Sequence, residues 1–305
     1  MSTFETPLVS IIIPCYKAEK ELPEALASIS SQTYSHWEVV AVIDGWEDRS
    51  EEILKSFQSN HPRNQVTIIN HTHNKGLAGA RNTGLIASRG DFIALLDHDD
   101  IWTPEHLDTA LSLMQNRTAE LYFTPVIYMR ADGAKTDFVW GPTPQDLESF
   151  ADALYGRNFM APSGVVFSRK IFNRVGLMDK TVKGCEDHDY WLRAYLAGSI
   201  FCHSITPTAK YRVNNSQAMT SNISSMLKMD IRVQKKHYSS NSFSYRAKRS
   251  AIANNYSLLS KDLKRKKPLE AYYYSLLAIF WSPTKIRHIK TLIKSILFEP
   301  WAHKN

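Results

Sequence analysis

The first hundred residues alternate between short apolar runs and segments with helical spacing, and this alternation constrains the fold more than any other feature. Each apolar run is rich in β-branched residues, which indicates a buried strand. The predicted strands are Leu8–Ile13, Trp37–Asp44, Val66–Asn70 and Asp91–Asp97, and the predicted helices between them are Glu21–Ser31, Ser50–Gln58 and Gly76–Ser88. Strands and helices that alternate at this spacing predict right-handed crossovers and a mostly parallel α/β sheet.

Polar residues follow the predicted strands at the points where the strands end. These segments are Pro14-Cys15-Tyr16, Asp44-Gly45, His71–Gly76 and Asp97-His98-Asp99-Asp100. In a parallel α/β sheet, ligands bind beyond the carboxyl ends of the strands. The four segments therefore indicate a binding site at one edge of the sheet.

The acidic segment Asp97-His98-Asp99-Asp100 has two interpretations. Two carboxylates about 5 Å apart repel by roughly 3 kcal/mol at an effective dielectric of 20, so the three acids need compensation. A hard divalent cation supplies it and keeps open positions for phosphate oxygens. Alternatively, Asp100 or Thr103 caps a helix that starts at Pro104. One cap uses one residue, so the two interpretations are compatible.

Three other segments each allow a structural and a functional interpretation. Asp44-Gly45 is most often a turn after a strand. The glycines of Asn74–Asn82 resemble a phosphate-binding loop, although small residues there also let a helix pack closely on a sheet. The acids of Glu186–Arg193 suit a helix start, where the dipole favours negative charge, and they also suit a general base.

In this order, the segments resemble the family 2 glycosyltransferases, which have the GT-A fold. The matching stretches are PLVSIIIPCYKAEKELPEALASISSQTYSHWEVVAVIDG, NKGLAGARNTGLIASRGDFIALLDHDD and GCEDHDYWLRA. A single Asp-x-Asp motif is weak evidence, whereas the ordered set is specific. The resemblance implies a Rossmann-like domain that moves a sugar from a nucleotide-diphosphate sugar, most often a UDP-sugar, to a hydroxyl group of a glycan or lipid-linked acceptor.

The resemblance also implies a role for each matching position. Pro14, Tyr16 and Asp44 would contact the nucleotide base, and Arg81 or Lys75 would face the nucleotide or its phosphates. Asp97 would lie on the ribose side, and Asp99 would ligate Mn²⁺ or Mg²⁺ with help from Asp97 and Asp100. Ser163 and Gly164 would lie near the diphosphate and the acceptor, and Arg212 would begin a loop, 212–222, that closes over the donor.

The implied chemistry inverts the anomeric carbon. Asp187 would accept the proton of the attacking hydroxyl, with Glu186 as its competitor for that role. The alternative is an inactive module of the same fold that binds a nucleotide-sugar or a glycan, and the retained Asp97, Asp99 and Asp187 argue against it. A nucleotidyltransferase would need a glycine-rich signature after the first strand, and PCYKAEKEL does not supply one.

Two positions depart from the family pattern. Relatives often have Asp-Asp-Gly-Ser after the second strand, where this chain has Ile43-Asp44-Gly45-Trp46. Some relatives also have a histidine metal ligand in the late loop, where this chain has Asn214-Asn215. The first departure changes the rim of the expected nucleotide pocket, and the second removes a third protein ligand for the metal.

Charge separates the C-terminal region from the rest of the chain. Residues 225–305 contain 17 Lys and Arg against 4 Asp and Glu, a net charge of +13, whereas the whole chain carries +7, so residues 1–224 carry −6. We therefore expect a catalytic domain at 1–224, a basic helical region at 225–305, and no nucleic-acid partner for the body.

The basic region predicts contact with an anionic membrane surface. Apolar residues recur at helical spacing among lysines from Ile286 to Leu297, which is typical of a basic amphipathic helix. The alternative is helical packing on the body or on a second subunit, so an oligomer is also compatible with the sequence. Three unpaired cysteines and the absence of a signal peptide predict a cytoplasmic protein, peripheral on the inner face of the cell membrane.

Overall fold

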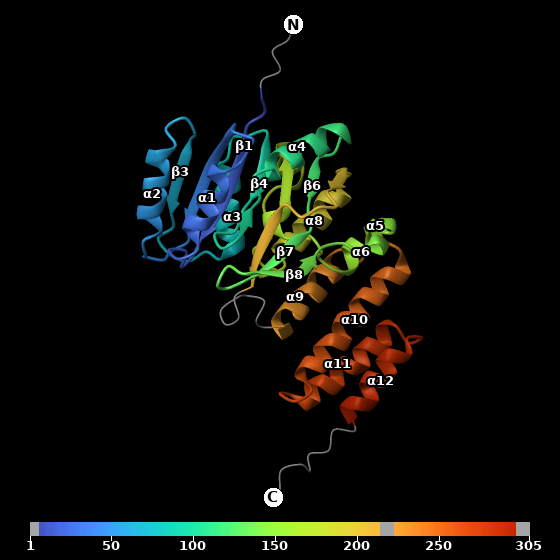
Figure 1. Cartoon of the computed structure of the whole chain (residues 1–305). Coiled ribbons are helices and arrows are strands. Elements are labelled where there is room, and N and C mark those ends of the chain that lie inside the picture. The colour runs from blue at the N-terminus through green and yellow to red at the C-terminus, as the bar shows by residue number, and fades with distance from the viewer. Residues whose placement is uncertain (1–5, 214–222, 297–305) are drawn as a thin grey trace, which may run out of the picture. The chain divides into compact units, whose positions relative to one another are not determined.

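The computed structural model describes residues 6–213 and 223–296, with side chains described as far as residue 292. The chain divides into two compact units, Met1–Pro142 with Phe159–Asn215 and Thr143–Asn158 with Ser216–Asn305 (Figure 1). The part of the expected donor-closing loop at 214–222, including Asn214 and Asn215, lies outside the described residues.

A seven-stranded sheet forms the centre of the first unit, in the order β10-β6-β9-β4-β1-β2-β3. Its strands are β1 (Val9–Cys15), β2 (Trp37–Ile43), β3 (Val66–Asn70), β4 (Phe92–Leu95), β6 (Leu121–Phe123), β9 (Val165–Ser168) and β10 (Phe201–His203). Strands β1 to β4 pair in parallel, and β9 runs antiparallel to both β4 and β6. The predicted mostly parallel α/β sheet is confirmed, and the four N-terminal strands end at one edge.

Helices cover both faces of this sheet (Figure 1). They are α1 (Leu22–Ser30), α2 (Ser50–Asn60), α3 (Leu77–Ala87), α4 (His106–Asn116), α7 (Arg169–Val175) and α8 (Glu186–Leu196). On one face, Ile11 and Ile13 pack with Leu22 and other core residues of α1, α2 and α4. On the other face, a Cβ at Gly84 of α3 would lie 2.4 Å from the Cγ2 atom of Ile12. Only glycine lets α3 approach β1 so closely at this position, so Gly84 has a packing role.

A second, four-stranded sheet has the order β5-β11-β7-β8. Its strands are β5 (Ile101–Trp102), β7 (Val126–Arg130), β8 (Lys135–Trp140) and β11 (Ala209–Val213). The neighbouring strands β6 and β7 belong to different sheets, because Pro125 between them has no N–H to continue the ladder. The edge strand β8 has mostly exposed side chains, so its sequence carries little apolar signal for a strand.

The second unit is helical and consists of α5 (Pro144–Glu148), α6 (Phe150–Gly156), α9 (Ile223–Lys236), α10 (Tyr245–Leu263), α11 (Pro268–Trp281) and α12 (Ile286–Ile296). Tyr155 of α6 donates a hydrogen bond to the carbonyl of Gln234 (2.5 Å) and packs on Phe243. These contacts group α6 with the C-terminal helices, whereas we expected a simple division at residue 225. Within the described ranges, no helix is long and apolar enough to cross a bilayer.

Candidate active site

The ends of β1 and β2 form the first part of the candidate site. Asp44 directly follows β2 and is 3% exposed. Its Oδ1 atom accepts a hydrogen bond from the backbone N–H of Lys75 (2.8 Å). The same atom lies 2.6 Å from Nδ1 of His71. Gly45 has a φ of +66°, and a Cβ there would lie 2.3 Å from the backbone nitrogen of Asn74. The turn after β2 is therefore held against the loop after β3. Asp44 has this structural role independently of its expected contact with the nucleotide base.

An exposed aromatic pair lies beside this turn. The rings of Tyr16 and Trp46 meet edge to face at 5.5 Å, and each side chain is 41% exposed. The ammonium of Lys17 lies 4.3 Å from the centre of the Trp46 ring. Pro14 is buried, and its carbonyl is 3.1 Å from Nδ1 of His98 in the acidic segment. The exposed rings offer flat apolar faces of the kind that stack on nucleobases.

A buried arginine joins the acidic segment to the start of α8. Arg81 lies in α3 and is 1% exposed. Its Nη2 atom donates to both carboxylate oxygens of Asp97 (2.8 and 2.9 Å), and its Nη1 atom donates to Oε1 of Glu186 (3.1 Å). Burial would lower the pKa of Arg81, but Asp97 and Glu186 raise it above its usual value, so the guanidinium stays charged. Arg81 therefore positions two acids, and its expected contact with the nucleotide stays a prediction.

The carboxylate of Asp100 is held within the acidic segment. Its Oδ2 atom accepts a hydrogen bond from the hydroxyl of Ser163 (2.5 Å), and its Oδ1 atom accepts one from the backbone N–H of Arg212 (2.9 Å). The same hydroxyl oxygen accepts from the N–H of Asp97 (3.0 Å). Burial, together with Asp99 and Asp97, raises the pKa of Asp100 well above its usual range. These contacts favour a structural role for Asp100 in the segment 97–100. The expected contribution of Asp100 to metal binding stays a prediction, and these contacts argue against it.

Asp99 differs from its two acidic neighbours. Its carboxylate accepts no hydrogen bond from another residue in the described ranges, while its main-chain carbonyl accepts one from Nε of Arg212 (2.9 Å). Burial is the main cause that raises the pKa of Asp99. Across residues 6–213 and 223–296, no group of three or more His, Cys, Asp or Glu side chains is arranged to hold a metal ion. Within the described ranges, a cation here would depend on Asp99, with Asp97 beside it.

Two adjacent acids begin α8 and have different surroundings. Glu186 is 2% exposed, and Arg81 and the N–H of Gly184 (2.7 Å) hold its two oxygens. Asp187 is half-buried, and its Oδ1 atom accepts from the N–H of His188 (2.7 Å). Burial and then the charge of Glu186 raise the pKa of Asp187 to about 6, while Arg81 opposes the rise. Asp187 is thus the acid of the pair that is suited to take up a proton near neutral pH.

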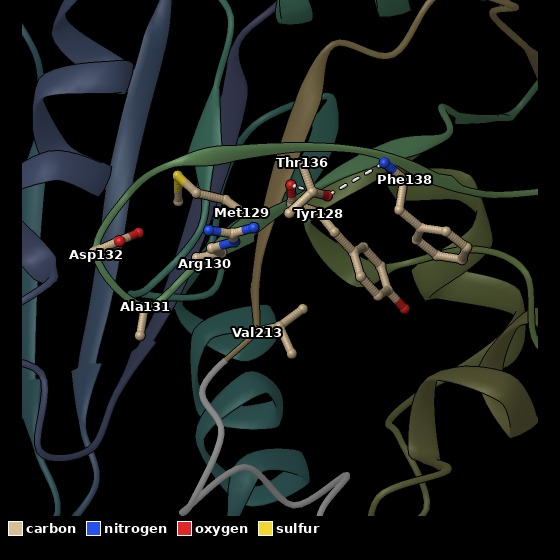
Figure 2. A pocket seen from close by; sticks show the side chains of 8 residues that line it. All are labelled: Tyr128, Met129, Arg130, Ala131, Asp132, Thr136, Phe138 and Val213. Atoms are coloured by element: carbon tan, nitrogen blue, oxygen red, sulfur yellow. Dashed lines mark hydrogen bonds between the residues drawn. The ribbon is translucent and has the colours of Figure 1, made fainter.

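A pocket of about 530 Å³ lies on the second sheet, beside the acidic segment. Figure 2 shows Tyr128 and Phe138 at one end of it and Asp132 at the other. The guanidinium of Arg212 connects the two features, because it donates to the carbonyls of both Ala131 (3.2 Å) and Asp99 (2.9 Å). Arg212 is 4% exposed and also pairs with Glu24 (2.7 Å). It therefore supports the site from inside, and its expected contact with the donor stays a prediction.

The structure brings most of the predicted residues together in the first unit. Asp97, Arg81 and Glu186 are connected to one another, and the N–H of Asp97 extends this network through the hydroxyl of Ser163 to Asp100 and Arg212. Gly164 is buried beneath them, where a Cβ would lie 2.9 Å from the carbonyl of Thr124. Lys75 is bound to Asp44 through its backbone only, and its side chain is exposed.

Sequence reasoning missed the contribution of two histidines. His71 was considered only as the first residue of the segment that follows the third predicted strand, yet it contacts Asp44 and also Oγ1 of Thr83 (2.9 Å). His98 was treated only as part of the acidic segment, although it reaches the end of β1. Their position in the sequence could have identified them, because both histidines directly follow parallel strands whose ends share one edge of the sheet.

The sequence model of glycosyl transferase family 2 matches residues 10–176, more than half of the chain. The chain belongs to this family. It is 34% identical over 137 residues to TuaG of Bacillus subtilis, a protein named for teichuronic acid biosynthesis, which covers 45% of this chain and 54% of TuaG. It is 36% identical over 116 residues to WfgD of Escherichia coli, which covers 38% of this chain and 44% of WfgD. The matches thus span about half the length of these relatives.

Solved structures confirm the GT-A fold. Residues 1–349 of TarS from S. aureus superpose with a TM-score of 0.67 at 15% identity, covering 94% of this chain and 88% of that chain. The mannosyltransferase PcManGT from Pyrobaculum calidifontis, in complex with GDP-Man and Mn²⁺, gives a TM-score of 0.64 at 16% identity, covering 99% of this chain and 89% of that chain. At these identities the likeness concerns the fold.

Proposed function

We propose that this protein is an inverting glycosyltransferase that moves a sugar from a nucleotide-diphosphate donor, UDP-linked, to a hydroxyl group of a glycan or lipid-linked glycan. The observation that carries the proposal is the difference between the adjacent acids Glu186 and Asp187. Arg81 and Gly184 hold Glu186, whereas Asp187 has a pKa raised to about 6 on the first turn of α8. A carboxylate with this pKa is an efficient general base near neutral pH.

Names of relatives support the substrate classes. WfgD is named as a glucosyltransferase that uses UDP-Glc and a GlcNAc-diphosphoundecaprenol acceptor. A TarS structure has been solved in complex with UDP-GlcNAc. By analogy, we assign the exposed rings of Tyr16 and Trp46 to the nucleotide base and the exposed side chain of Lys75 to the diphosphate.

In the proposed reaction, Asp187 accepts the hydroxyl proton while the oxygen attacks the anomeric carbon from the face opposite the nucleotide. The bond between the sugar and the nucleoside diphosphate breaks, and its electrons go to the departing phosphate oxygen. Arg81 keeps Asp97 and Glu186 fixed throughout, so Glu186 stays beside Asp187, whose pKa is raised first by burial and then by Glu186.

A divalent cation, Mn²⁺ or Mg²⁺, fits the acidic segment in one arrangement. Asp99 has a carboxylate that no other described residue binds, and Asp97 lies two residues before it. Mg²⁺ in proteins commonly takes one or two carboxylates and completes its shell with water and phosphate oxygens. When bound, such a cation would neutralise charge on the departing diphosphate. The Mn²⁺ complex of PcManGT supports this assignment.

We assign the acceptor to the pocket on the second sheet. Tyr128 and Phe138 meet edge to face there at 4.7 Å, and Phe138 is 55% exposed. Aromatic faces provide apolar contact for the ring of an incoming sugar. Truncation of Phe138 to Ala should raise the KM for acceptor about fivefold and leave the KM for donor unchanged; a change in donor KM alone would place the acceptor elsewhere.

The test of the function is a panel of nucleotide-sugars incubated with the full chain and Mn²⁺ or Mg²⁺. We expect metal-dependent release of the nucleoside diphosphate from one or a few UDP-sugars, accelerated by a glycan acceptor and abolished by EDTA. Tight binding of a nucleotide-sugar without any turnover would instead favour the inactive binding module.

A further inference from the structure

An apolar stripe runs along the exposed side of α11. Leu269 is 85% exposed, and Tyr273, Leu276 and Phe280 follow it at 56%, 42% and 68%. Their spacing of four, three and four residues places them on one face of the helix. Tyr272 borders the same face at 41% exposure. The opposite face, which contains Ala271, Ser275 and Ala278, is buried within the helical unit.

In the described part of α12, two polar side chains pack inward and two apolar side chains are exposed. His288 and Thr291 are 0% and 6% exposed, and Thr291 lies 3.2 Å from the hydroxyl of Ser257 in α10. Ile286 and Ile289 are 67% and 42% exposed. A helix that packed on its unit in the ordinary way would bury the isoleucines and expose the histidine. Within residues 286–292, whose side chains the structure describes, α12 therefore directs Ile286 and Ile289 away from the core of its own unit.

Cations flank the stripe at both ends. Arg265, Lys266 and Lys267 precede α11, and Lys285, Arg287 and Lys290 follow it. Two acids lie near the first group, where Lys266 pairs with Asp262 at 3.7 Å and Lys267 with Glu270 at 2.8 Å. Such exposed pairs are weak. Residues 261–290 contain eight Lys and Arg against these two acids, so the region has a net charge of +6.

The arrangement of charge selects one kind of partner. In a symmetric pair of stripes, cations would meet cations whether the helices ran parallel or antiparallel, because both ends are positive. An anionic lipid surface accepts both ends at once, while the aromatic and aliphatic side chains enter the boundary between headgroups and acyl chains. We propose that the exposed face of α11 and α12 binds an anionic membrane surface, which goes beyond glycosyl transfer and places this unit at the membrane by contact and not by a span.

The experiment is co-sedimentation of the full chain with vesicles of phosphatidylcholine alone or with phosphatidylglycerol added. We expect binding only to the anionic vesicles, with at least tenfold weaker binding when NaCl is raised from 50 to 500 mM. The double variant Leu269→Ser, Phe280→Ser should weaken binding about tenfold or more. The matched control is Ile205→Ser, because Ile205 is 88% exposed but belongs to the other unit.

A second variant keeps the test independent of the apolar residues. Arg265→Glu with Lys266→Glu should weaken binding more than tenfold, since each cation near an anionic surface contributes about fivefold. All variants should release nucleoside diphosphate from donor at the wild-type rate, so failure here is distinguishable from failure of the proposed function. Equal binding to both vesicle types, or binding unchanged in both variants, would overturn the proposal. So would a dimer in light scattering that the double variant abolishes while vesicles stay unbound, which would make a second copy the partner.

Discussion

Two regions of the molecule depart from the usual rule that charged side chains are exposed and apolar ones are buried. They are the acidic edge of the large sheet and the outer face of α11 and α12. At the sheet edge, Arg81 and Glu186 are charged and almost completely buried. On the helical face, Leu269 and Phe280 are apolar and mostly exposed. Both arrangements are unusual for a soluble domain. We infer that the buried charges are kept for chemistry that needs fixed groups, and that the exposed apolar residues are kept for a partner that removes them from water.

The largest effect should come from Asp187, the proposed general base on the first turn of α8. Asp187→Asn keeps the shape of the side chain but removes the proton acceptor, so we expect the rate of sugar transfer to fall about a thousandfold. The affinity for UDP, measured by calorimetry, should stay within about twofold. A transfer rate that stays near the wild-type value would show that Asp187 is not the base.

Substitution of the buried arginine should destabilise the protein most. Arg81→Met leaves the carboxylates of Asp97 and Glu186 without their partner, and breaking a buried ion pair from one side costs about 3–5 kcal/mol. Urea unfolding of both proteins gives this difference. Arg49→Met is the matched control, because Arg49 pairs with Glu52 in solvent, where such pairs contribute little to stability. An equal loss in the free energy of unfolding for the two variants would show that burial does not increase the contribution of the Arg81 ion pairs to stability.

The contrast between these two arginines also shows where sequence reasoning ended. The strands and helices of the first hundred residues were predictable, because period and composition are local properties of the chain. The partners of Arg81 were not, because Glu186 lies 105 residues away and no local pattern links them. We expected Arg81 to face the nucleotide, whereas its described contacts are to two acids. The contact of His71 with Asp44, across 27 residues, escaped for the same reason.

The C-terminal helices illustrate a different limit. The amphipathic pattern of residues 286–297 was visible in the sequence, and we used it to predict membrane contact. The pattern does not reveal which face of a helix packs inward, because that depends on its neighbours. The burial of His288 and Thr291 gives this information for α12. The stripe on α11 was not predicted, since its sequence is apolar on nearly all sides.

The pH dependence of sugar transfer tests the difference between the adjacent acids Glu186 and Asp187. The raised pKa of Asp187 means that the acid is protonated, and inactive as a base, below about pH 6. We expect kcat/KM to rise about tenfold per pH unit below 6 and to level off above it. Burial raises this pKa most, the charge of Glu186 raises it further, and Arg81 and His188 lower it. A rate that is constant from pH 5 to 8 would contradict the assignment.

The smallest effect should come from the exposed stripe. Leu269→Ser removes an apolar side chain that contributes little to folding, because it is 85% exposed in the folded unit. We expect the free energy of unfolding to change by less than about 0.5 kcal/mol. Leu259→Ser, at a fully buried position of the same unit, should cost more than about 2 kcal/mol. If Leu269→Ser destabilised the protein as much as Leu259→Ser, the stripe would be covered in solution by part of the protein itself. In that case the stripe on α11 would be buried like the charged residues at the sheet edge, and its apolar residues would stabilise the fold instead of binding a partner.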